Sequence, residues 1–285
     1  MPELPEVETI RRILVNGMEG IPSILGQQVS GASLFWPKTL ETQNLTELCA
    51  RLGGRQLISA ARRGKFLIFD FGEASLLIHL RMSGDLRMAQ GLGAPRRQLP
   101  VLTHDRFYLH FQSGWGLAFN DTRKFGRVWF VDNPESILEK LGMDPFSPEL
   151  DGSQFYKMLQ SKDRQIKTLL LDQTFLAGIG NIYSDEALFG SHIHPRRSSR
   201  SLSKAEAQLL LTKIREVLEL GIAHNGSSID WVYRGGGFQN YFQVYQRKGQ
   251  PCPCCGAVIQ RASMGQRSTH YCPNCQPVFQ AEKEE

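Results

Sequence analysis

Four cysteines near the C-terminus constrain this chain more than any other feature. They form two Cys-x2-Cys pairs, Cys252 with Cys255 and Cys272 with Cys275, separated by 16 residues. Each pair lets one turn present two thiolates to a metal ion, and the interval is long enough for a returning β-hairpin. The spacing predicts a four-thiolate ribbon with one structural Zn2+. The less favoured alternative is iron in a rubredoxin-like site.

A neighbouring cysteine makes the choice of ligands in the first pair ambiguous. Cys252-Pro253-Cys254 is also a close pair, but we favour Cys255 because a two-residue spacer then occurs on both sides. Disulfide frameworks spread their cysteines around a fold, whereas five of the six here fall in the last 34 residues. This clustering favours metal over disulfides. Cys49, far from the others, is predicted to be a small buried residue of a helix.

The charge is concentrated in the C-terminal third. The chain has 285 residues, 41% hydrophobic and 21% charged, which is ordinary globular composition with room for two domains. Residues 190–275 hold 11 basic against 4 acidic side chains, whereas the remainder holds 22 against 24. A basic region of this kind favours a polyanionic partner, the alternative being a solvated basic face.

The sequence gives no sign of a membrane segment or a secretion signal. No apolar run approaches the roughly 18 residues that a spanning helix needs. The first residues include Glu3 and Glu6, where a signal peptide would be basic and then apolar. We therefore expect no membrane partner and a cytoplasmic location.

The periodicity predicts an α+β chain. Val7, Ile10 and Leu14 recur at helical spacing behind Pro5. Short apolar segments with glycine turns then run to about residue 132 and predict an antiparallel β-sandwich with flanking helices. Residues 89–104 have the composition of an exposed loop.

The second half is predicted to be helical before the cysteine module. The segment 133–148, with three prolines, is typical of a linker, and helices are expected near 152–160, 164–173, 181–190 and 203–220. The predicted domains are therefore a β-sandwich at 1–132, a linker at 133–150, a helical region with a flexible glycine-rich loop at 151–242 and a zinc finger at 243–285.

A turn near residue 180 has two possible interpretations. Gly178-Ile179-Gly180 resembles the start of a dinucleotide loop, but Tyr183 occupies the place of its third glycine. We prefer a tight corner between two helices with Asn181 as N-cap, where free backbone N–H groups suit a phosphate. A plain interhelical turn is the alternative.

The first residues carry a possible nucleophile. Once Met1 is removed, Pro2 is a secondary amine, and α-amino groups titrate near pH 8, so on the order of 10% is neutral at pH 7. Such an amine can attack a sugar C1′ and form an iminium ion, and Glu3 beside it can transfer a proton.

Taken together, these segments resemble the bacterial formamidopyrimidine-DNA glycosylases along essentially the whole chain. The resemblance is carried, in chain order, by Pro2-Glu3-Leu4-Pro5-Glu6-Val7-Glu8-Thr9, Arg63-Gly64-Lys65-Phe66-Leu67, His79-Leu80-Arg81-Met82-Ser83-Gly84, Asp121-Thr122-Arg123-Lys124-Phe125-Gly126, Ile166-Lys167, Gly178-Ile179-Gly180-Asn181-Ile182-Tyr183 and Cys272-Pro273-Asn274-Cys275-Gln276.

The resemblance implies a bifunctional base-excision repair enzyme. It would act on double-stranded DNA with oxidised bases or abasic sites, removing 8-oxoguanine and formamidopyrimidines and cleaving the strand by β- and δ-elimination. It would work as a monomer, with a helix-two-turn-helix domain before the zinc finger. The alternatives are an endonuclease VIII-like glycosylase for oxidised pyrimidines, disfavoured by Leu4 where that branch usually has glycine, and a non-catalytic zinc-ribbon DNA-binding protein.

The resemblance also implies a role for particular residues. Pro2 would be the Schiff-base nucleophile and Glu3 the proton donor, with Lys65 acting in β-elimination and Arg267 in δ-elimination. The gap left by the flipped nucleotide would be filled by Met82, Arg123 and Phe125, and the further DNA contacts would be His104, Lys162, Lys167 and Asn181.

Each of these roles has a plainer alternative. Phe125 and Met82 are also compatible with core positions, Lys65 with a solvated strand end, and Arg267 with a simple phosphate contact. Arg106 stands where the family commonly has a second histidine, which weakens the match at His104.

Overall fold

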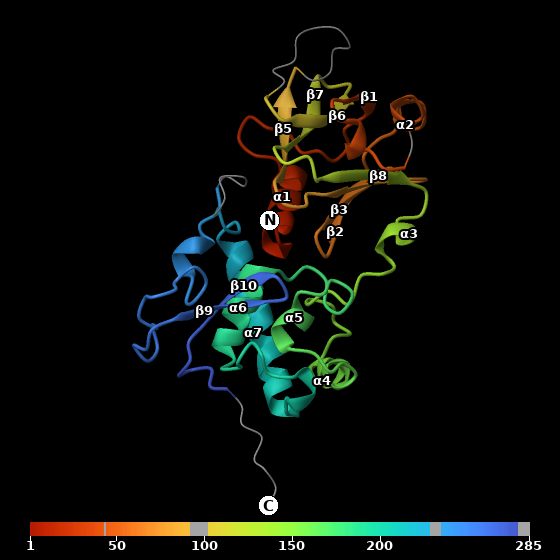
Figure 1. The fold of residues 1–285 in the computed structure, drawn as a ribbon. Coiled ribbons are helices and arrows are strands. Elements are labelled where there is room, and N and C mark those ends of the chain that lie inside the picture. Colours follow the sequence, from red (N-terminus) through yellow and green to blue (C-terminus); the bar gives the residue numbers. More distant parts are fainter. Residues whose placement is uncertain (43, 92–101, 229–234, 279–285) are drawn as a thin grey trace, which may run out of the picture. The chain divides into compact units, whose positions relative to one another are not determined.

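Residues 1–42, 44–91, 102–228 and 235–278 are described by a computed structural model, in which the chain forms two units (Figure 1). The first unit comprises Met1–Glu139 with Asn225–Gly236, and the second comprises Lys140–His224 with Gly237–Glu285. The later segment 225–236 thus belongs with the N-terminal residues, although it follows the last long helix in the sequence.

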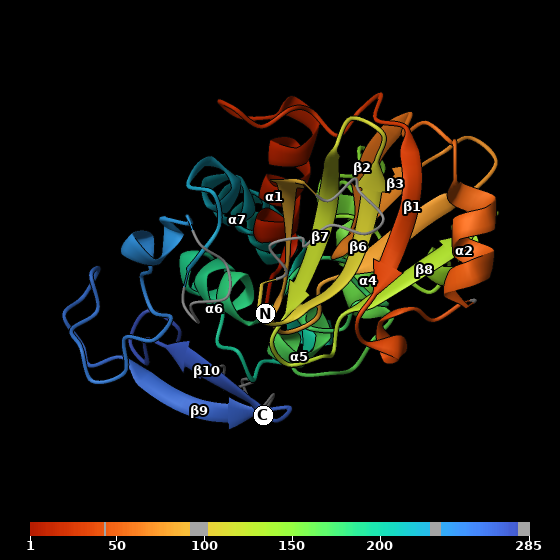
Figure 2. The same cartoon turned by 90° about the horizontal axis from the view of Figure 1, so that it is seen from above.

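Short apolar segments form two antiparallel four-stranded sheets in the first unit. One sheet has the order β1-β6-β7-β5 and the other β2-β3-β4-β8. The strand bounds are β1 Val29–Leu34, β2 Ser59–Arg63, β3 Phe66–Asp70, β4 Ser75–His79, β5 Gly84–Gln90, β6 Asp105–Phe111, β7 Trp115–Asp121 and β8 Arg127–Val131. Figure 2 shows β1, β6 and β7 in one layer and β2 and β3 in the other.

One hydrophobic core joins the two sheets. Phe107, Leu109 and Phe111 alternate along β6 and lie in the same cluster as Leu76 and Ile78 of β4. A strand with period-two burial places one face inward, so a shared cluster between two such sheets makes a sandwich. Two helices complete this core with their apolar sides: α1 Leu4–Asn16 and α2 Leu45–Leu52.

The second unit is mainly helical. Its longest helix, α7 Lys204–Ala223, begins in a capping box in which Ser203 accepts from the backbone of Glu206 and its own N–H donates to the Glu206 carboxylate. The buried stripe of α7 packs against α4 Gly152–Gln160 and α6 Asn181–Gly190. The other elements of this unit are α5 Ile166–Leu170, the 3-10 helices η2 Ser199–Ser201 and η3 Phe238–Tyr241, and the hairpin strands β9 Gln260–Met264 and β10 Arg267–Tyr271.

The α+β class, the antiparallel sandwich, the helical region and the finger with its hairpin are confirmed. Four short helical elements were not predicted: η1 Pro37–Thr39, α3 Glu135–Leu138 inside the proline-containing segment, η2, and η3 within the segment predicted to be a loop. Most of the predicted loop at 89–104 and the centre of the glycine-rich segment lie outside the described residues. None of the helices in the described ranges is both long and apolar enough to span a bilayer.

The prediction that Asn181 caps its helix is wrong. Gly180 occupies the N-cap of α6 and Asn181 is the first helical residue. Its side chain is thereby released from capping and donates to the Ser268 carbonyl of β10 at 2.8 Å. Gly178, with φ of 100°, supplies the left-handed backbone of the corner.

Candidate active site and DNA-binding residues

The N-terminus is fixed in place at the start of α1. Pro2 is buried and Glu3 is 2% exposed. The backbone N–H of Glu3 donates to the Glu6 carboxylate at 2.8 Å, and the other Glu6 oxygen accepts from the backbone N–H of Ser227 at 2.7 Å. Glu6 therefore joins the residue next to Pro2 to the later segment of the same unit. The sequence places Met1 before Pro2, so the Pro2 nitrogen is a free amine only once Met1 is removed.

Lys65 lies in the turn between β2 and β3. The turn pairs Arg63 with Phe66, and Gly64 adopts φ of 57°, which favours glycine. Lys65 is only 5% exposed, so it is not the solvated strand-end lysine of the alternative interpretation.

His79 stands opposite this turn, because it pairs with Phe66 across β3 and β4. Burial lowers the pKa of His79 to about 3, and the positive charges of Arg81 and Lys65 add to the effect. The ring is therefore neutral near pH 7. Its Nδ1 accepts from the Arg81 backbone N–H at 3.0 Å, which leaves the proton on Nε2 as a donor.

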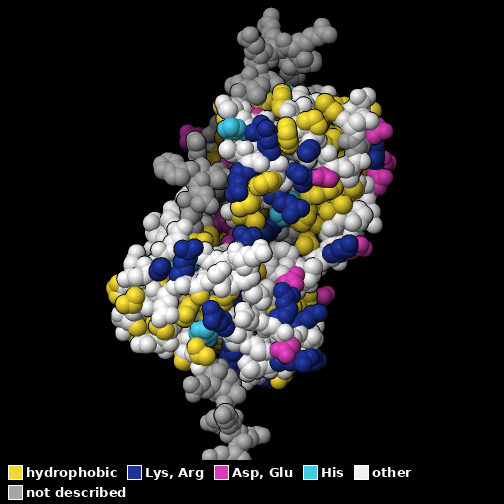
Figure 3. All heavy atoms as spheres, viewed as in Figure 1, with side chains coloured by type: hydrophobic (Ala, Val, Ile, Leu, Met, Phe, Trp, Pro, Cys, Tyr) yellow, Lys and Arg dark blue, Asp and Glu magenta, His cyan; other side chains and the backbone are white. Residues whose placement is uncertain are grey.

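Two turns of the first unit carry the residues predicted to enter DNA. Met82 lies half-buried in the turn after β4, and Arg123 and Phe125 lie in the turn after β7. Phe125 is 47% exposed, and the Arg123 guanidinium lies 5.4 Å from the centre of its ring. Phe125 is therefore not a core residue. Figure 3 shows Lys and Arg side chains beside hydrophobic ones on this unit.

His104 is exposed in the segment before β6 and has φ of 85°. Its Nδ1 lies 3.1 Å from an Arg106 nitrogen. The next residue, Asp105, is buried and forms an ion pair with Arg87 at 2.7 Å, while its carboxylate accepts from the Leu102 N–H at 2.9 Å. These contacts set the backbone that presents His104.

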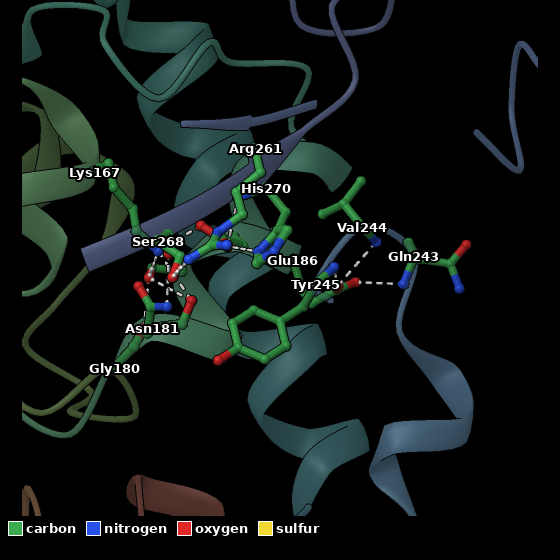
Figure 4. A network of polar contacts seen from close by, with 12 residues as sticks. Lys167, Gly180, Asn181, Glu186, Gln243, Val244, Tyr245, Arg261, Ser268 and His270 are labelled. Atoms are coloured by element: carbon green, nitrogen blue, oxygen red, sulfur yellow. Dashed lines mark hydrogen bonds and ion pairs between the residues drawn. The ribbon is translucent and has the colours of Figure 1, made fainter. Parts of the chain in front are cut away.

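Lys167 is not at the surface, so the prediction that it contacts DNA directly is contradicted. Its side chain is 0% exposed, and its ammonium bonds to Asp185 at 2.5 Å, to Ser184 at 2.7 Å and to the Asn181 carbonyl at 2.9 Å (Figure 4). These three acceptors match the three N–H groups of an ammonium. Lys167 instead fixes the start of α6, which carries Asn181.

Two adjacent carboxylates of α6 bind the finger and the chain leading into it. Asp185 accepts from the His270 N–H of β10 at 2.9 Å. Glu186 accepts from three successive backbone N–H groups, those of Gln243, Val244 and Tyr245 (Figure 4). Burial raises the pKa of Glu186 although these N–H groups favour its ionised form. Neither acid was singled out from the sequence, because these backbone partners lie 57 to 85 residues away.

The remaining predicted residues of this unit are exposed. Lys162 follows α4, and Arg267 begins β10 after the turn Gly265-Gln266. Both turn residues have positive φ, 53° and 62°, as a tight two-residue hairpin requires. Arg261 of β9 bonds to Ser268 at 3.1 Å, so the hairpin presents two arginines.

The four predicted metal ligands come together. Their sulfur atoms all lie within 4.8 Å of one another, with Cys252 and Cys275 3.8 Å apart and Cys255 and Cys272 3.5 Å apart. Tetrahedral zinc with Zn–S of about 2.3 Å separates its sulfurs by about 3.8 Å. Backbone N–H groups of Cys254 and Cys275 point to the sulfurs of Cys252 and Cys272, both at 3.4 Å. This donor set fits one zinc ion, and Cys254 is exposed and outside it.

The sandwich with its buried Pro2 and Glu3, the helical unit and the thiolate finger define a zinc-finger DNA glycosylase of the base-excision repair class. The formamidopyrimidine-DNA glycosylase N-terminal domain matches residues 1–128, and the H2TH domain of the same enzymes matches residues 141–232. The zinc finger found in FPG and IleRS matches residues 249–278.

Whole-chain relatives agree with these matches. The formamidopyrimidine-DNA glycosylases of Pelotomaculum thermopropionicum and Chloroflexus aurantiacus are 38% and 41% identical, over 98% of this chain and 100% and 99% of theirs. Lactococcus lactis Fpg (MutM) bound to FAPY-dG DNA has a TM-score of 0.84 at 36% identity, covering 97% of this chain and all of that one. A MutM complex with carbocyclic 8-oxo-G DNA gives 0.84 at 37%, with the same coverage. The chain belongs to the formamidopyrimidine-DNA glycosylase family.

Proposed function

We propose that this chain is a bifunctional DNA glycosylase that removes oxidised purines from duplex DNA and then cleaves the strand as an abasic-site lyase. The observation that carries the proposal is the buried Pro2-Glu3 start, fixed through Glu6 at the head of α1 in a chain of this family. Structural relatives bound to FAPY-dG, carbocyclic 8-oxo-G and abasic-site DNA support the same substrate class.

Chemistry at the sugar follows from the Pro2 amine. Its nitrogen lone pair forms a bond to C1′ as the C1′–N bond to the base breaks, and Glu3 supplies the proton that lets the base or ring oxygen depart. Opening of the sugar ring leaves an iminium ion between Pro2 and C1′. Loss of a C2′ proton then expels the 3′ phosphate, a further elimination expels the 5′ phosphate, and water releases the sugar fragment from Pro2.

The other predicted residues divide between elimination and binding. Lys65 would assist β-elimination and Arg267 δ-elimination. Because flipping a nucleotide costs a few kcal/mol, Met82 and Phe125 would replace lost stacking and Arg123 would bond the orphaned base. His104, Lys162 and Asn181 would contact the phosphate backbone. Lys167 would act indirectly, by holding α6 and Asn181.

We also propose the division of the sequence into parts at 1–132, 133–150, 151–242 and 243–285, although Asn225–Gly236 belong to the first unit of the fold. We further propose a monomeric chain acting in the cytoplasm on nucleoid DNA. This location follows from the proposed activity, whose substrate is chromosomal DNA.

Substrate preference tests the proposal. Duplexes with 8-oxoguanine opposite cytosine should be nicked at least about tenfold faster than duplexes with thymine glycol, since a site built for one base edge rejects another strongly. Single-turnover cleavage on denaturing gels measures this. Preference for thymine glycol would reassign the chain to the oxidised-pyrimidine branch, and no cleavage of any lesion duplex would leave a DNA-binding protein.

A further inference from the structure

A buried carboxylate joins the two loops that carry Met82, Arg123 and Phe125. Asp121, the last residue of β7, is 0% exposed. One of its oxygens accepts from the Ser83 hydroxyl and from the Arg123 backbone N–H at 3.1 Å. Its other oxygen accepts from the Gly126 N–H at 2.7 Å. The Asp121 side chain therefore holds both ends of the segment 123–126.

Ser83 extends these contacts of the Asp121 carboxylate, here called the clamp, to the turn that carries Met82. It thereby forms a bridge between the two loops. Its hydroxyl donates to Asp121 and accepts from the Arg123 N–H at 3.0 Å, so it belongs to both contacts. Ser83 is 2% exposed and follows Met82 directly, in a turn closed by a 2.9 Å bond from the Gly84 N–H to the Leu80 carbonyl. The position of Met82 is thus linked to that of Arg123 through one hydroxyl and one carboxylate.

The backbone of Asp121 contacts the segment that carries His104. Its N–H donates to the His104 carbonyl at 2.9 Å, and its carbonyl accepts from the Arg106 side chain at 2.8 Å. These contacts do not use the carboxylate. Replacing the Asp121 side chain therefore removes contacts to the two loops and leaves the backbone contacts of His104 in place.

Close packing makes the bridge stiff. A Cβ on Gly84 would stand 2.7 Å from the Phe119 ring, and a Cβ on Gly126 would stand 2.2 Å from it. Both glycines thus lie flush on the fully buried Phe119, whereas residues 122–125 are exposed. The exposed tip is fixed at its base, where the Asp121 carboxylate binds.

We infer that Asp121 is a positioning residue that sets Met82 against Arg123 and Phe125, so that the two loops enter the duplex as one rigid wedge. This inference rests on the proposed function. Holding both loops before DNA arrives removes the cost of ordering them separately on binding. An aspartate suits the task because each of its oxygens accepts, whereas asparagine would turn an N–H donor toward either Gly126 or Arg123.

Asp121→Asn and Ser83→Ala test the inference in the full-length, zinc-loaded protein. The first keeps the volume but breaks one arm of the clamp, and the second removes only the bridge. Asp70→Asn is the matched control, because Asp70 also ends a strand and accepts from a turn N–H, that of Gly72 at 2.9 Å.

Two substrates separate positioning from chemistry. Excision of 8-oxoguanine from duplex DNA requires the wedge, whereas cleavage of a single-stranded abasic oligonucleotide requires no flipping. We expect both variants to slow duplex excision roughly tenfold, the loss of about one charge-assisted hydrogen bond. They should cleave the single strand at the wild-type rate, and fluorescence of 2-aminopurine beside the lesion should rise more slowly on binding. Asp70→Asn should match wild type in all three.

The pair Asp121→Asn and Met82→Ala gives the decisive comparison. If Asp121 acts through the wedge, the two losses combine less than additively in the double variant, because interacting residues are non-additive. Fully additive losses, or equal slowing on both substrates, would overturn the inference. A wild-type protein inactive on both substrates would instead refute the proposed function. If Asp121→Asn fails to fold, Ser83→Ala carries the same comparison.

Discussion

Glu3→Gln is expected to abolish base excision while leaving cleavage at a preformed abasic site largely intact. Glutamine keeps the shape of Glu3 in its 2% exposed position but has no acidic proton for the departing base. General acid catalysis is worth roughly 10²- to 10⁴-fold, so excision of 8-oxoguanine should slow by about that factor. An abasic sugar has already lost its base and equilibrates with an open aldehyde, which Pro2 can attack directly. Single-turnover rates on the two duplexes measure the split.

Glu8→Gln is the matched control for this prediction. Glu8 is also a buried acid of α1, but it pairs with Arg11 and Arg12. Burial opposes its ionisation, yet hydrogen bonds from the two arginines outweigh it and the pKa of Glu8 is lowered. Glu8→Gln should cost stability and slow both substrates equally, if at all. Equal slowing of cleavage on both substrates by Glu3→Gln would contradict the role of Glu3 as proton donor.

Removal of zinc is expected to abolish DNA binding before it unfolds the first unit. Cys252 and Cys272 share a small core with Phe189 of α6, and Ser268 of the hairpin binds Asn181. Without zinc the hairpin is released, and Arg261, Arg267 and Asn181 lose their placement together. Because phosphate contacts dominate affinity for DNA, binding should weaken by roughly two orders of magnitude or more.

Cys272→Ser and chelated protein can be compared with Cys254→Ser, whose thiol is exposed and outside the ligand set. Trp36, Trp115 and Trp129 lie in the described part of the first unit, so a change in their fluorescence reports its unfolding separately. Cys254→Ser should retain one zinc per chain and full affinity by fluorescence anisotropy. Unchanged affinity in a verified metal-free sample would contradict the role assigned to the finger.

Local chemistry explains what the sequence predicted well. Thiolate spacing within one short segment encodes the ligand set, so Cys252, Cys255, Cys272 and Cys275 were identified without a fold. The strands of the sandwich were likewise predictable, because their apolar residues are short runs between glycine turns. The roles proposed for Pro2 and Glu3 come from the family resemblance, because composition alone would leave these residues as an ordinary terminus.

Partners distant in the chain explain what the sequence did not predict. Lys167 looked like an exposed cation because its neutralising acid, Asp185, lies 18 residues away and is visible only once α5 packs on α6. Asp121 and Ser83 are 38 residues apart and meet only because β5 and β7 are neighbours. Glu6 had a detectable signal, since its spacing from Glu3 is that of a capping box.

Covalent trapping on the terminal amine tests the central claim most directly. Protein whose intact mass shows loss of Met1 is incubated with an 8-oxoguanine duplex and borohydride, and the adduct is digested and mapped by mass spectrometry. The account predicts one reduced sugar linkage, on Pro2, which is absent when Met1 is retained. A lesion duplex that never becomes linked to the mature, zinc-loaded chain, or a linkage that maps to Lys65 instead, would contradict it.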